Sequence, residues 1–411
     1  MRQVRLTRRG KAFAVAALVL LVAAPVLSLP ALLSAFALVT GLVGCAVVYV
    51  LLGQSGLTVR RTFDPDVVPH GGTVTATLVV DNLSGWPTVA ARWNDTVPTA
   101  VGADASGVLP GLGGRHARTA RSTLTYAVQG RRRGLHRLGP LRVETLDPFG
   151  LARREREVGD VQEVLVLPRS ERLDRSAAPA VDDEGAAHAA PHLAGLGEDD
   201  VVARPYLPGD ALKRMHWKAT AHRGEPMVRQ EEQWADPRAG LVLDTHDASF
   251  GTAHEGGEWS YSPELEWAVT AAASIATHLV GAGYAVTTRS VGGGVDRELV
   301  EADGLRDTLV DLAVVEPTSG PLPASAEVDP GERTVLAVLG RLDVERAAAW
   351  AGALASAHRV SALVLASTRP EALDVLERAG WRVGTYSAQD DVAQAWSGLQ
   401  RRGEVAAGAE G

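Results

Sequence analysis

The chain is poor in cysteine and in aromatic residues. Its 411 residues include a single cysteine, Cys45, and aromatic side chains make up only 5% of the sequence. One thiol excludes an intrachain disulfide and a zinc site built from several thiolates. Basic residues number 41 and acidic residues 49, which gives a formal charge of −8. That balance argues against a general nucleic-acid-binding surface, which needs a basic footprint.

Charged residues are missing from one long segment near the start of the chain. Residues 12–59 contain no Asp, Glu, Lys or Arg, whereas residues 1–11 hold five basic residues. One helix of that length would measure about 72 Å, more than twice the roughly 30 Å hydrocarbon core of a bilayer. The segment therefore predicts a transmembrane helical hairpin within residues 1–54, with helices at Ala12–Leu29 and Ala31–Leu52.

Basic residues flank this hairpin on both sides, because Arg60 and Arg61 follow the second helix. The positive-inside rule then places both ends, and the soluble part after them, in the cytoplasm. We expect a two-span protein of the inner or plasma membrane. Two alternatives stay open, namely a cleaved signal peptide and a single span with an extracytoplasmic body.

An alternating pattern of apolar and polar residues begins after the hairpin. It is clearest at Val74–Val80 and recurs at 88–93, 122–128, 141–145 and 161–167, with Gly, Pro, Asn and Asp between the segments. Period-two alternation broken at short intervals predicts an antiparallel sandwich of immunoglobulin-like type. We assign it residues 55–169.

A basic run, Arg131–Arg137, lies inside this predicted sandwich and is followed by Asp147-Pro148-Phe149-Gly150-Leu151. One interpretation is that the arginines pair with nearby acids and that Phe149 fills the core beneath an Asp-Pro turn. The other is a basic patch facing anionic lipid, in which Arg153, Arg154 and Arg156 join the run and each basic residue near the surface contributes about 1 kcal/mol.

Composition separates the remaining segments. Residues 170–197 are rich in Ala, Asp, Glu, His and Pro and are typical of a flexible linker. Residues 198–235 form a dense segment with prolines, glycines and basic side chains. Within it Pro208-Gly209 predicts a turn, Asp210 a helix N-cap, and Gly224 with Pro226 the end of a short helix. Met227–Gln230 then predicts a strand.

This segment resembles the signature of the bacterial family called domain of unknown function 58. The matching residues are Tyr206, Pro208-Gly209-Asp210, Arg214, His216-Trp217-Lys218, Thr220-Ala221 and Arg223-Gly224. Met215 replaces the usual Ile, and His222 the usual Arg. The resemblance implies association with a MoxR-type AAA+ ATPase and, as a further partner, a transglutaminase-like membrane protein. One interpretation is that the basic side chains of this segment pair within the chain and lock it against the α/β domain. The other is a docking surface for a partner with an acidic face, formed by Tyr206, Gly209, Asp210, Lys213, Arg214, His216, Trp217, Lys218 and Arg223.

Strands and helices alternate over residues 236–400, with strands expected at 240–244 and Thr334–Leu339 among others, ahead of an expected disordered tail at 401–411. Repeated strand–helix units predict a mostly parallel sheet covered on both faces. Its first strand ends at Asp244, a position similar to the metal-ion-dependent adhesion site of von Willebrand factor A domains. His246 and Ala248 stand where that site has serines, so we expect residues 236–400 to form a von Willebrand factor A-like α/β domain with a degenerate version of the site. The chain as a whole is thus predicted to be an α+β multidomain protein.

Three functions follow from these patterns. The first is a membrane-anchored, non-catalytic scaffold or adaptor whose cytoplasmic part docks a partner, without a cofactor. The second is a ligand-binding module dependent on a divalent metal such as Mg²⁺, held by Asp244, Asp247 and Ser249 through oxygen ligands. The third is an uncharacterised hydrolase. We expect no enzyme, because phosphate-binding, metalloprotease and nucleophile-elbow motifs are missing from the sequence.

Overall fold

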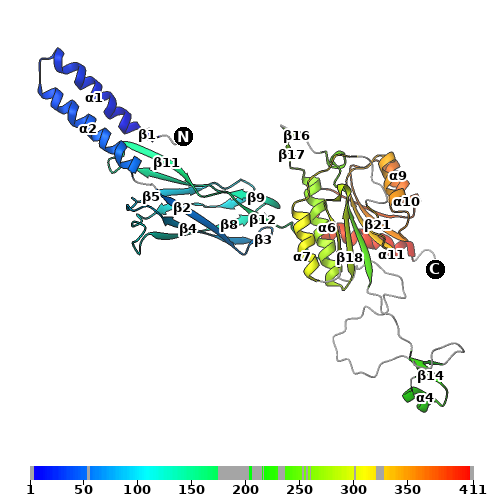
Figure 1. Cartoon of the computed structure of the whole chain (residues 1–411). Coiled ribbons are helices and arrows are strands. Elements are labelled where there is room, and N and C mark those ends of the chain that lie inside the picture. Colours follow the sequence, from blue (N-terminus) through cyan, green and yellow to red (C-terminus); the bar gives the residue numbers. More distant parts are fainter. Residues whose placement is uncertain are drawn as a thin grey trace. The chain divides into compact units, whose positions relative to one another are not determined.

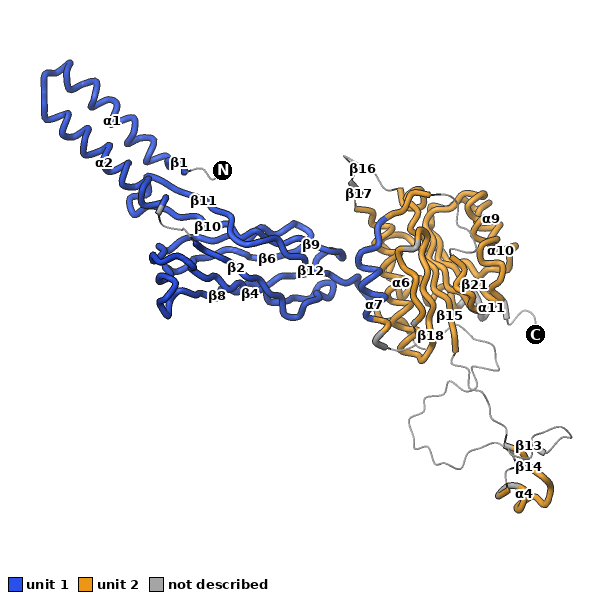
Figure 2. The backbone as a smooth tube through the Cα atoms, in the orientation of Figure 1, with its two compact units in different colours: residues 1–170, 306–316 blue, residues 171–305, 317–411 orange. Residues whose placement is uncertain are grey.

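The chain divides into two compact units, which Figure 2 shows in different colours. Unit 1 comprises Met1–Ser170 and Arg306–Glu316, and unit 2 comprises Glu171–Leu305 and Pro317–Gly411. The computed structural model describes residues 4–52, 56–174, 203–205, 215, 217–229, 237–251, 254–255, 258–259, 261–299, 302–320 and 328–407.

Unit 1 begins with a helical hairpin made of α1 (Arg8–Val26) and α2 (Ala31–Leu52) (Figure 1). The bounds of α2 match the prediction, but α1 begins four residues earlier than expected. The reason is Thr7, whose hydroxyl oxygen accepts a hydrogen bond from the backbone N–H of Gly10 at 3.1 Å. Both helices are long and apolar enough to cross a bilayer, and many of their large apolar side chains are exposed.

The hairpin is joined to the β-rich part of unit 1 at both of its open ends. Strand β1 (Val4–Leu6) precedes α1 and pairs antiparallel with β11 (Ala152–Val158). At the end of α2, Ala46 and Val50 pack against Leu151 and Ala152 in one small buried cluster. A three-residue strand has no sequence pattern of its own, so β1 was not predicted.

The β-rich part has two main layers. One sheet has the strand order β1-β11-β10-β5-β7 and the other β2-β4-β8-β6, with a smaller sheet β3-β12-β9. Their strands are β2 (Leu57–Asp64), β3 (Val67–Val68), β4 (Thr73–Asn82), β5 (Ala91–Asp95), β6 (Val101–Ala103), β7 (Ser106–Leu109), β8 (Arg121–Gly130), β9 (Gly134–Leu138), β10 (Leu141–Leu146) and β12 (Gln162–Val166). Inward-facing residues of both sheets form one core, which confirms the predicted β-sandwich architecture.

The basic run after β8 lies at the end of the sandwich away from the hairpin. The end of β4 at Asn82 pairs with the start of β2, which follows the hairpin. β8 begins at this same end and runs antiparallel to β4, so Gly130 and the basic run after it lie at the opposite end. Arg133 is buried, and its guanidinium donates to the carbonyls of Leu312 at 3.1 Å and Val315 at 2.7 Å, within unit 1. Arg137 pairs with Glu163. Arg133 is therefore structural, whereas Arg131, Arg132 and Arg137 are exposed, and for these the lipid-facing patch stays a prediction.

Unit 2 contains a six-stranded sheet of order β19-β18-β15-β20-β21-β22 (Figure 1). β15 (Arg238–Leu243), β18 (Ala285–Ser290), β20 (Thr334–Leu339), β21 (Arg359–Leu365) and β22 (Arg382–Tyr386) are parallel, and β19 (Asp296–Leu299) is an antiparallel edge. The mostly parallel sheet is thus confirmed. The helices of unit 2 are α5 (Asp247–Phe250), α6 (Pro263–Gly281), α9 (Val344–Ala353), α10 (Pro370–Arg378) and α11 (Val392–Ala407). Helix α7 (Ala302–Ala313) belongs mostly to unit 1, which includes Arg306–Glu316.

Helix α11 continues to Ala407, beyond residue 401, where a disordered tail was expected to begin. Buried Trp396 and Leu399 hold the helix against the sheet, and its last turns extend from that packed part.

The segment that carries the family resemblance is described only in part. β13 (Ala203–Pro205) pairs antiparallel with β14 (Met227–Arg229), which confirms the strand at Met227. Helix α4 (Trp217–Arg223) begins after Met215, which instead forms a β-bridge with Val228. The expected helix from Asp210 through Met215 is therefore wrong at Met215. Several predicted docking residues lie outside the described residues, namely Tyr206, Gly209, Asp210, Lys213, Arg214 and His216.

Candidate functional site

The candidate site lies where the central strands β15 and β20 end. The chain passes from β15 to β18 on one side of it and later to β20 on the other side, so the strand order reverses between β15 and β20. In open parallel sheets, ligands bind beyond the carboxyl ends of the strands at such a switch point. Asp244, which the sequence singled out, stands at this place.

Asp244 is buried, and its carboxylate is enclosed by hydrogen-bond donors. One oxygen accepts from the backbone N–H of His246 at 2.9 Å, and the other from that of Gly340 at 3.3 Å. Burial raises the pKa of the Asp244 carboxyl above its ordinary range. Bonds from His246, Ser249 and Gly340, together with the charge of Arg346, oppose that rise without cancelling it.

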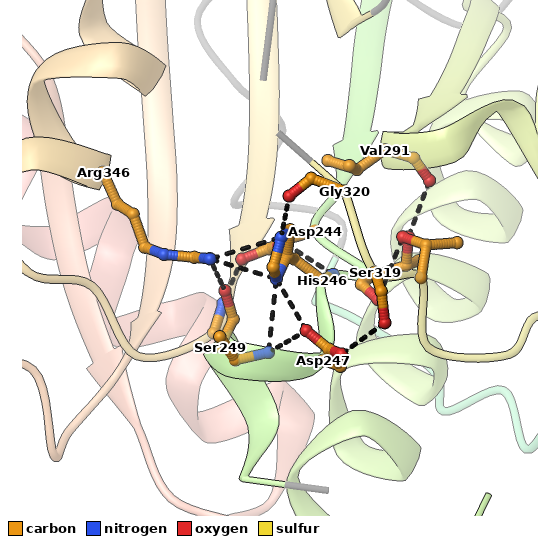
Figure 3. Close-up of polar contacts among 12 residues, drawn as sticks. Asp244, His246, Asp247, Ser249, Val291, Ser319, Gly320 and Arg346 are labelled. Carbon is orange, nitrogen blue, oxygen red and sulfur yellow. Dashed lines mark hydrogen bonds and ion pairs between the residues drawn. The ribbon is translucent and has the colours of Figure 1, made fainter. Parts of the chain in front are cut away.

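Arg346, in the first turn of α9, reaches across to the loop after β15 (Figure 3). Its guanidinium donates to the Ser249 hydroxyl at 2.9 Å and lies 3.0 Å from Nδ1 of His246. These contacts join the end of β15 to the helix that follows β20. A fixed positive charge therefore lies beside buried Asp244.

His246 is fixed on both ring nitrogens. Nε2 lies 2.8 Å from the carbonyl oxygen of Gly320, and Nδ1 accepts from the N–H of Ala248 at 3.2 Å. We assign the proton to Nε2, since that tautomer leaves Nδ1 free to accept from both Ala248 and Arg346. The ring thus caps the N-terminus of α5 and, through its hydrogen bond to Gly320, fixes the loop at that residue.

Asp247 is the most accessible acid of the cluster. Its Oδ1 accepts from the N–H of Ala248 at 2.6 Å, and its Oδ2 accepts from the Ser319 hydroxyl at 2.5 Å. The neighbouring Thr245 hydroxyl donates to the carbonyl of Val291 at 2.7 Å. These bonds tie the β15 loop to the segments after β18 and before residue 320 (Figure 3).

Gly340 is required by the close approach of two backbones. A Cβ at this position would lie 2.6 Å from the Ser249 Cβ and 2.7 Å from its carbonyl oxygen. The next residue, Arg341, donates its N–H to that same carbonyl at 2.7 Å. The loops after β15 and β20 therefore touch along their main chains.

Beneath the cluster, Tyr386 closes the apolar side of the site. Its hydroxyl donates to the carbonyl of Leu339 at 3.0 Å, and its ring stacks on Trp267 at 3.8 Å. Burial raises the pKa of Tyr386 well above its usual value, and the negative charges of Asp244 and Glu264 raise it further. The phenol stays protonated and serves as a structural donor.

The structure brings the three predicted metal ligands into one cluster, but their oxygens are already occupied by hydrogen bonds. The Asp244 oxygens face N–H donors, and the Ser249 oxygen accepts from Arg346. Among the described residues, no group of three or more His, Cys, Asp or Glu side chains is arranged to hold a metal ion. Ser249 is also buried, so its hydroxyl is not presented to a substrate.

An exposed rim surrounds this buried network. It comprises Arg341 after β20, Val344 at the start of α9, and Arg369 before α10, all exposed. The two loops that carry the arginines are joined, because the N–H of Leu342 donates to the Thr368 hydroxyl at 3.1 Å. Within the part of the chain that the structure describes, neither Arg341 nor Arg369 has a side-chain acceptor. We call these three residues the carboxyl-edge rim.

Sequence reasoning located Asp244 and missed Arg346, Gly340 and the rim. Arg346 lies 102 positions after Asp244, so no local spacing connects them. The sequence did hold a signal for Gly340, because it directly follows the predicted strand Thr334–Leu339 as Asp244 ends an earlier one. Neighbouring parallel strands end at the same edge of a sheet, so the two residues could have been expected to lie together.

Comparison with known proteins adds one family. No curated protein matches the chain. Among solved structures, the CARDB domain of a Pyrococcus furiosus protein is 17% identical, with 27% of this chain and 87% of that chain covered and a TM-score of 0.19. A cohesin module of a Clostridium perfringens family 33 glycoside hydrolase is 14% identical, with 28% and 98% covered and a TM-score of 0.20. At such TM-scores these likenesses carry no argument.

The family match falls on the segment that carries the sequence signature and on the first part of the α/β sheet. Residues 202–328 match the family model described as "Protein of unknown function DUF58". They include β15, Asp244 and the loop after β15, whereas Gly340 and Arg346, which complete the enclosure of Asp244, lie beyond them. This match supports membership of the chain in the DUF58 family.

Proposed function

We propose that this protein is a membrane-anchored adaptor without catalytic activity, whose α/β unit docks a partner protein at the carboxyl-edge rim. The observation that carries the proposal is the pair of exposed arginines, Arg341 and Arg369, on two loops joined by a hydrogen bond. A fixed surface of this kind binds a complementary acidic face with little loss of conformational entropy.

The buried network supports docking that does not depend on a metal ion. Arg346 supplies a positive charge beside Asp244, where a von Willebrand factor A domain would use a divalent cation. The sheet order and the position of the cluster favour a von Willebrand factor A-like architecture for unit 2. In this architecture the guanidinium replaces the cation as the group that organises the edge.

The first strand supports membrane anchorage by two spans. β1 precedes α1, and its partner β11 belongs to the domain that follows α2. Both open ends of the hairpin therefore meet one domain, as two spans require and a cleaved leader does not. The basic residues before α1 and after α2 support a cytoplasmic location of that domain by the positive-inside rule.

For the partner we propose a MoxR-type AAA+ ATPase, which the family resemblance implies, with a transglutaminase-like membrane protein as a further component. The rim requires that the contacting face of the ATPase be acidic. Exposed Trp217 and Arg223 of the signature segment add an aromatic and a basic contact.

The test is co-purification of the full chain, in detergent, with a MoxR-type AAA+ ATPase from the same organism, in the presence and absence of ATP. We expect retention of the ATPase by the native chain and at least a tenfold weaker affinity for the double variant Arg341→Glu, Arg369→Glu, which corresponds to about 1.4 kcal/mol.

The matched control is Arg382→Glu, which changes the same residue type at the amino end of β22, on the opposite edge of the sheet. It should bind like the native chain. Failure to retain the ATPase in any nucleotide state would contradict the proposed partner. Equal loss in the control would contradict the proposed surface.

A further inference from the structure

We infer that the β-sandwich rests on the bilayer surface through two loops that insert Phe149 and Trp86 among the lipid headgroups. The inference rests on the membrane anchorage proposed above. It concerns the end of unit 1 from which the helical hairpin leaves, and it makes this end a lipid-binding surface in its own right.

The first loop connects β10 to β11 and exposes two apolar side chains. Phe149 is 59% exposed and Leu146 is 52% exposed, contrary to the expectation that Phe149 fills the core. The loop is nonetheless rigid, because buried Asp147 accepts from the N–H groups of Phe149 at 2.9 Å and of Leu151 at 2.6 Å. An exposed aromatic ring on a fixed loop indicates a surface that something apolar covers.

This loop and strand β11, which follows it, are bound directly to the ends of the two hairpin helices. The Thr7 hydroxyl, which caps α1, donates to the carbonyl of Gly150 at 2.5 Å, and the Thr7 N–H donates to that of Leu151 at 2.9 Å. On the other side, Arg154 donates to the carbonyl of Leu51 at the end of α2 at 2.7 Å. Phe149 is thus held at the level where the apolar helices begin and end, which is the level of the headgroups.

The second loop connects β4 to β5 and exposes Leu83 and Trp86, the latter at 78%. The Leu83 N–H donates to the carbonyl of Gly56 at 2.8 Å, four residues after the end of α2. Four residues span at most about 15 Å, so this loop stays close to the same membrane boundary. Tryptophan is the residue most typical of the interface between lipid and water.

Trp86 is held as firmly as Phe149. The buried side chain of Asn82 donates to the carbonyls of Trp86 and Gly113, both at 2.8 Å, and the Ser84 hydroxyl also donates to Trp86 at 2.7 Å. These bonds join the β4–β5 loop to the loop 113–119, and Arg115 donates its N–H to the carbonyl of Ser84 at 2.7 Å.

The charge of this end suits anionic lipid. Loop 113–119 exposes Arg115, His116 and Arg118 and contains no acidic residue. The nearest acids are engaged, since Asp81 pairs with Arg121 and Asp147 binds backbone amides. Basic residues at the start of α1 add to the positive charge. Aromatic side chains beside unopposed cations are the composition of a surface that binds headgroup phosphates.

The chain has one native cysteine, so replacing it by serine leaves an introduced cysteine as the single thiol available for labelling. In a Cys45→Ser background, Phe149→Cys, Trp86→Cys and the control His70→Cys are each labelled with an environment-sensitive fluorophore. Each full chain is reconstituted into vesicles of phosphatidylcholine, with or without phosphatidylglycerol, containing a lipid spin-labelled near its headgroup. His70 is an exposed residue in the turn before β4, about 33 Å along that strand from the Leu83 end.

We expect several-fold stronger quenching and a blue-shifted emission at positions 149 and 86 than at position 70. Adding phosphatidylglycerol should increase quenching at position 86, and Arg115→Glu with Arg118→Glu should remove that increase. All replaced side chains are exposed, so unfolding midpoints should match those of the parent.

Two failures are distinguishable. Loss of the chain from the vesicles after an alkaline wash would overturn the membrane anchorage itself. If the chain is retained but the label at 149 or at 86 behaves like the one at 70, the lipid-binding surface is overturned and the anchorage stands.

Discussion

In the β-sandwich, the buried guanidinium of Arg61 forms a bidentate ion pair with the buried carboxylate of Asp95. The Nη2–Oδ1 distance is 2.6 Å and the Nε–Oδ2 distance is 3.1 Å. The Tyr126 hydroxyl donates to the same carboxylate at 2.6 Å, and Arg61 also donates to the carbonyls of Leu138 and Asp160. Through these bonds one arginine joins β2, β5, β8 and the segment around β9, so the pair fixes the register between the two sheets.

Removing one partner of this pair should be costly, because it leaves the other charge buried without compensation. We expect Asp95→Ala to lower the free energy of unfolding of unit 1 by about 3–5 kcal/mol, and the double variant Arg61→Met, Asp95→Leu to recover much of it. Chemical denaturation in detergent measures both. Arg121→Met, which breaks an exposed pair with Asp81, should change little. Equal effects of the buried and exposed replacements would contradict the assignment.

The contact between the loops after β15 and β20 predicts intolerance of a side chain at Gly340. Gly340→Ala forces a Cβ to within 2.7 Å of the Ser249 carbonyl oxygen, and we expect unit 2 to lose about 1–3 kcal/mol of stability. Gly352→Ala is the matched control, because it lies in α9 with open space around its Cβ. Helix propensity predicts a gain there of about 0.5–1 kcal/mol. A stable Gly340→Ala variant would mean that the two loops separate easily.

The raised pKa of Asp244 predicts a pH dependence of defined sign. Between the ordinary Asp pKa of about 3.9 and the raised value, the folded chain binds more protons than the unfolded one. The contribution of Asp244 to stability is therefore fully present below that window and is lost as the pH rises through it. Asp244→Asn should remove this decline, whatever its constant cost from altered hydrogen bonds. The measurement is the unfolding free energy of unit 2 against pH for both chains, and identical slopes would refute the effect.

The enclosure of Asp244 also predicts the response to divalent cations. Because its oxygens face N–H donors and Arg346 supplies a neighbouring positive charge, we expect no heat of binding on calorimetric titration with Mg²⁺, Mn²⁺ or Ca²⁺. Arg346→Ala removes the charge and is the informative variant, since binding of a cation is expected in this variant only. Saturable binding to the native chain would revive the metal-dependent alternative through Asp244, Asp247 and Ser249.

Regular patterns in the sequence predicted much of the fold. Strand β20 and helix α2 have the predicted bounds, because a run of apolar residues between clear breaks leaves no choice of register. β11 was missed, since its Arg and Glu residues show no apolar alternation. Its strand conformation comes from β1 and β10, which pair with it on both sides.

The candidate site was predictable only where its chemistry is local. Asp244 follows a buried strand directly, so its position in the fold could be inferred. Arg346 enters the cluster because α9 packs beside the end of β20. This packing brings it next to Asp244, which lies 102 positions earlier in the chain, so no local sequence pattern predicts the contact. Similarly, Phe149 sits in a motif that suggested core filling, while the tight binding of its loop by Asp147 and Thr7 turns the ring outward.

The short strand β1 has a mechanical consequence. A domain joined to a membrane by one flexible connection explores a hemisphere. Under the membrane anchorage that we propose, β1 and the end of α2 instead attach this domain to the helical hairpin at two points. Two attachments suppress tumbling and leave lateral diffusion as the main freedom of the sandwich. A partner confined to the same membrane then searches in two dimensions, against a target presented at constant height.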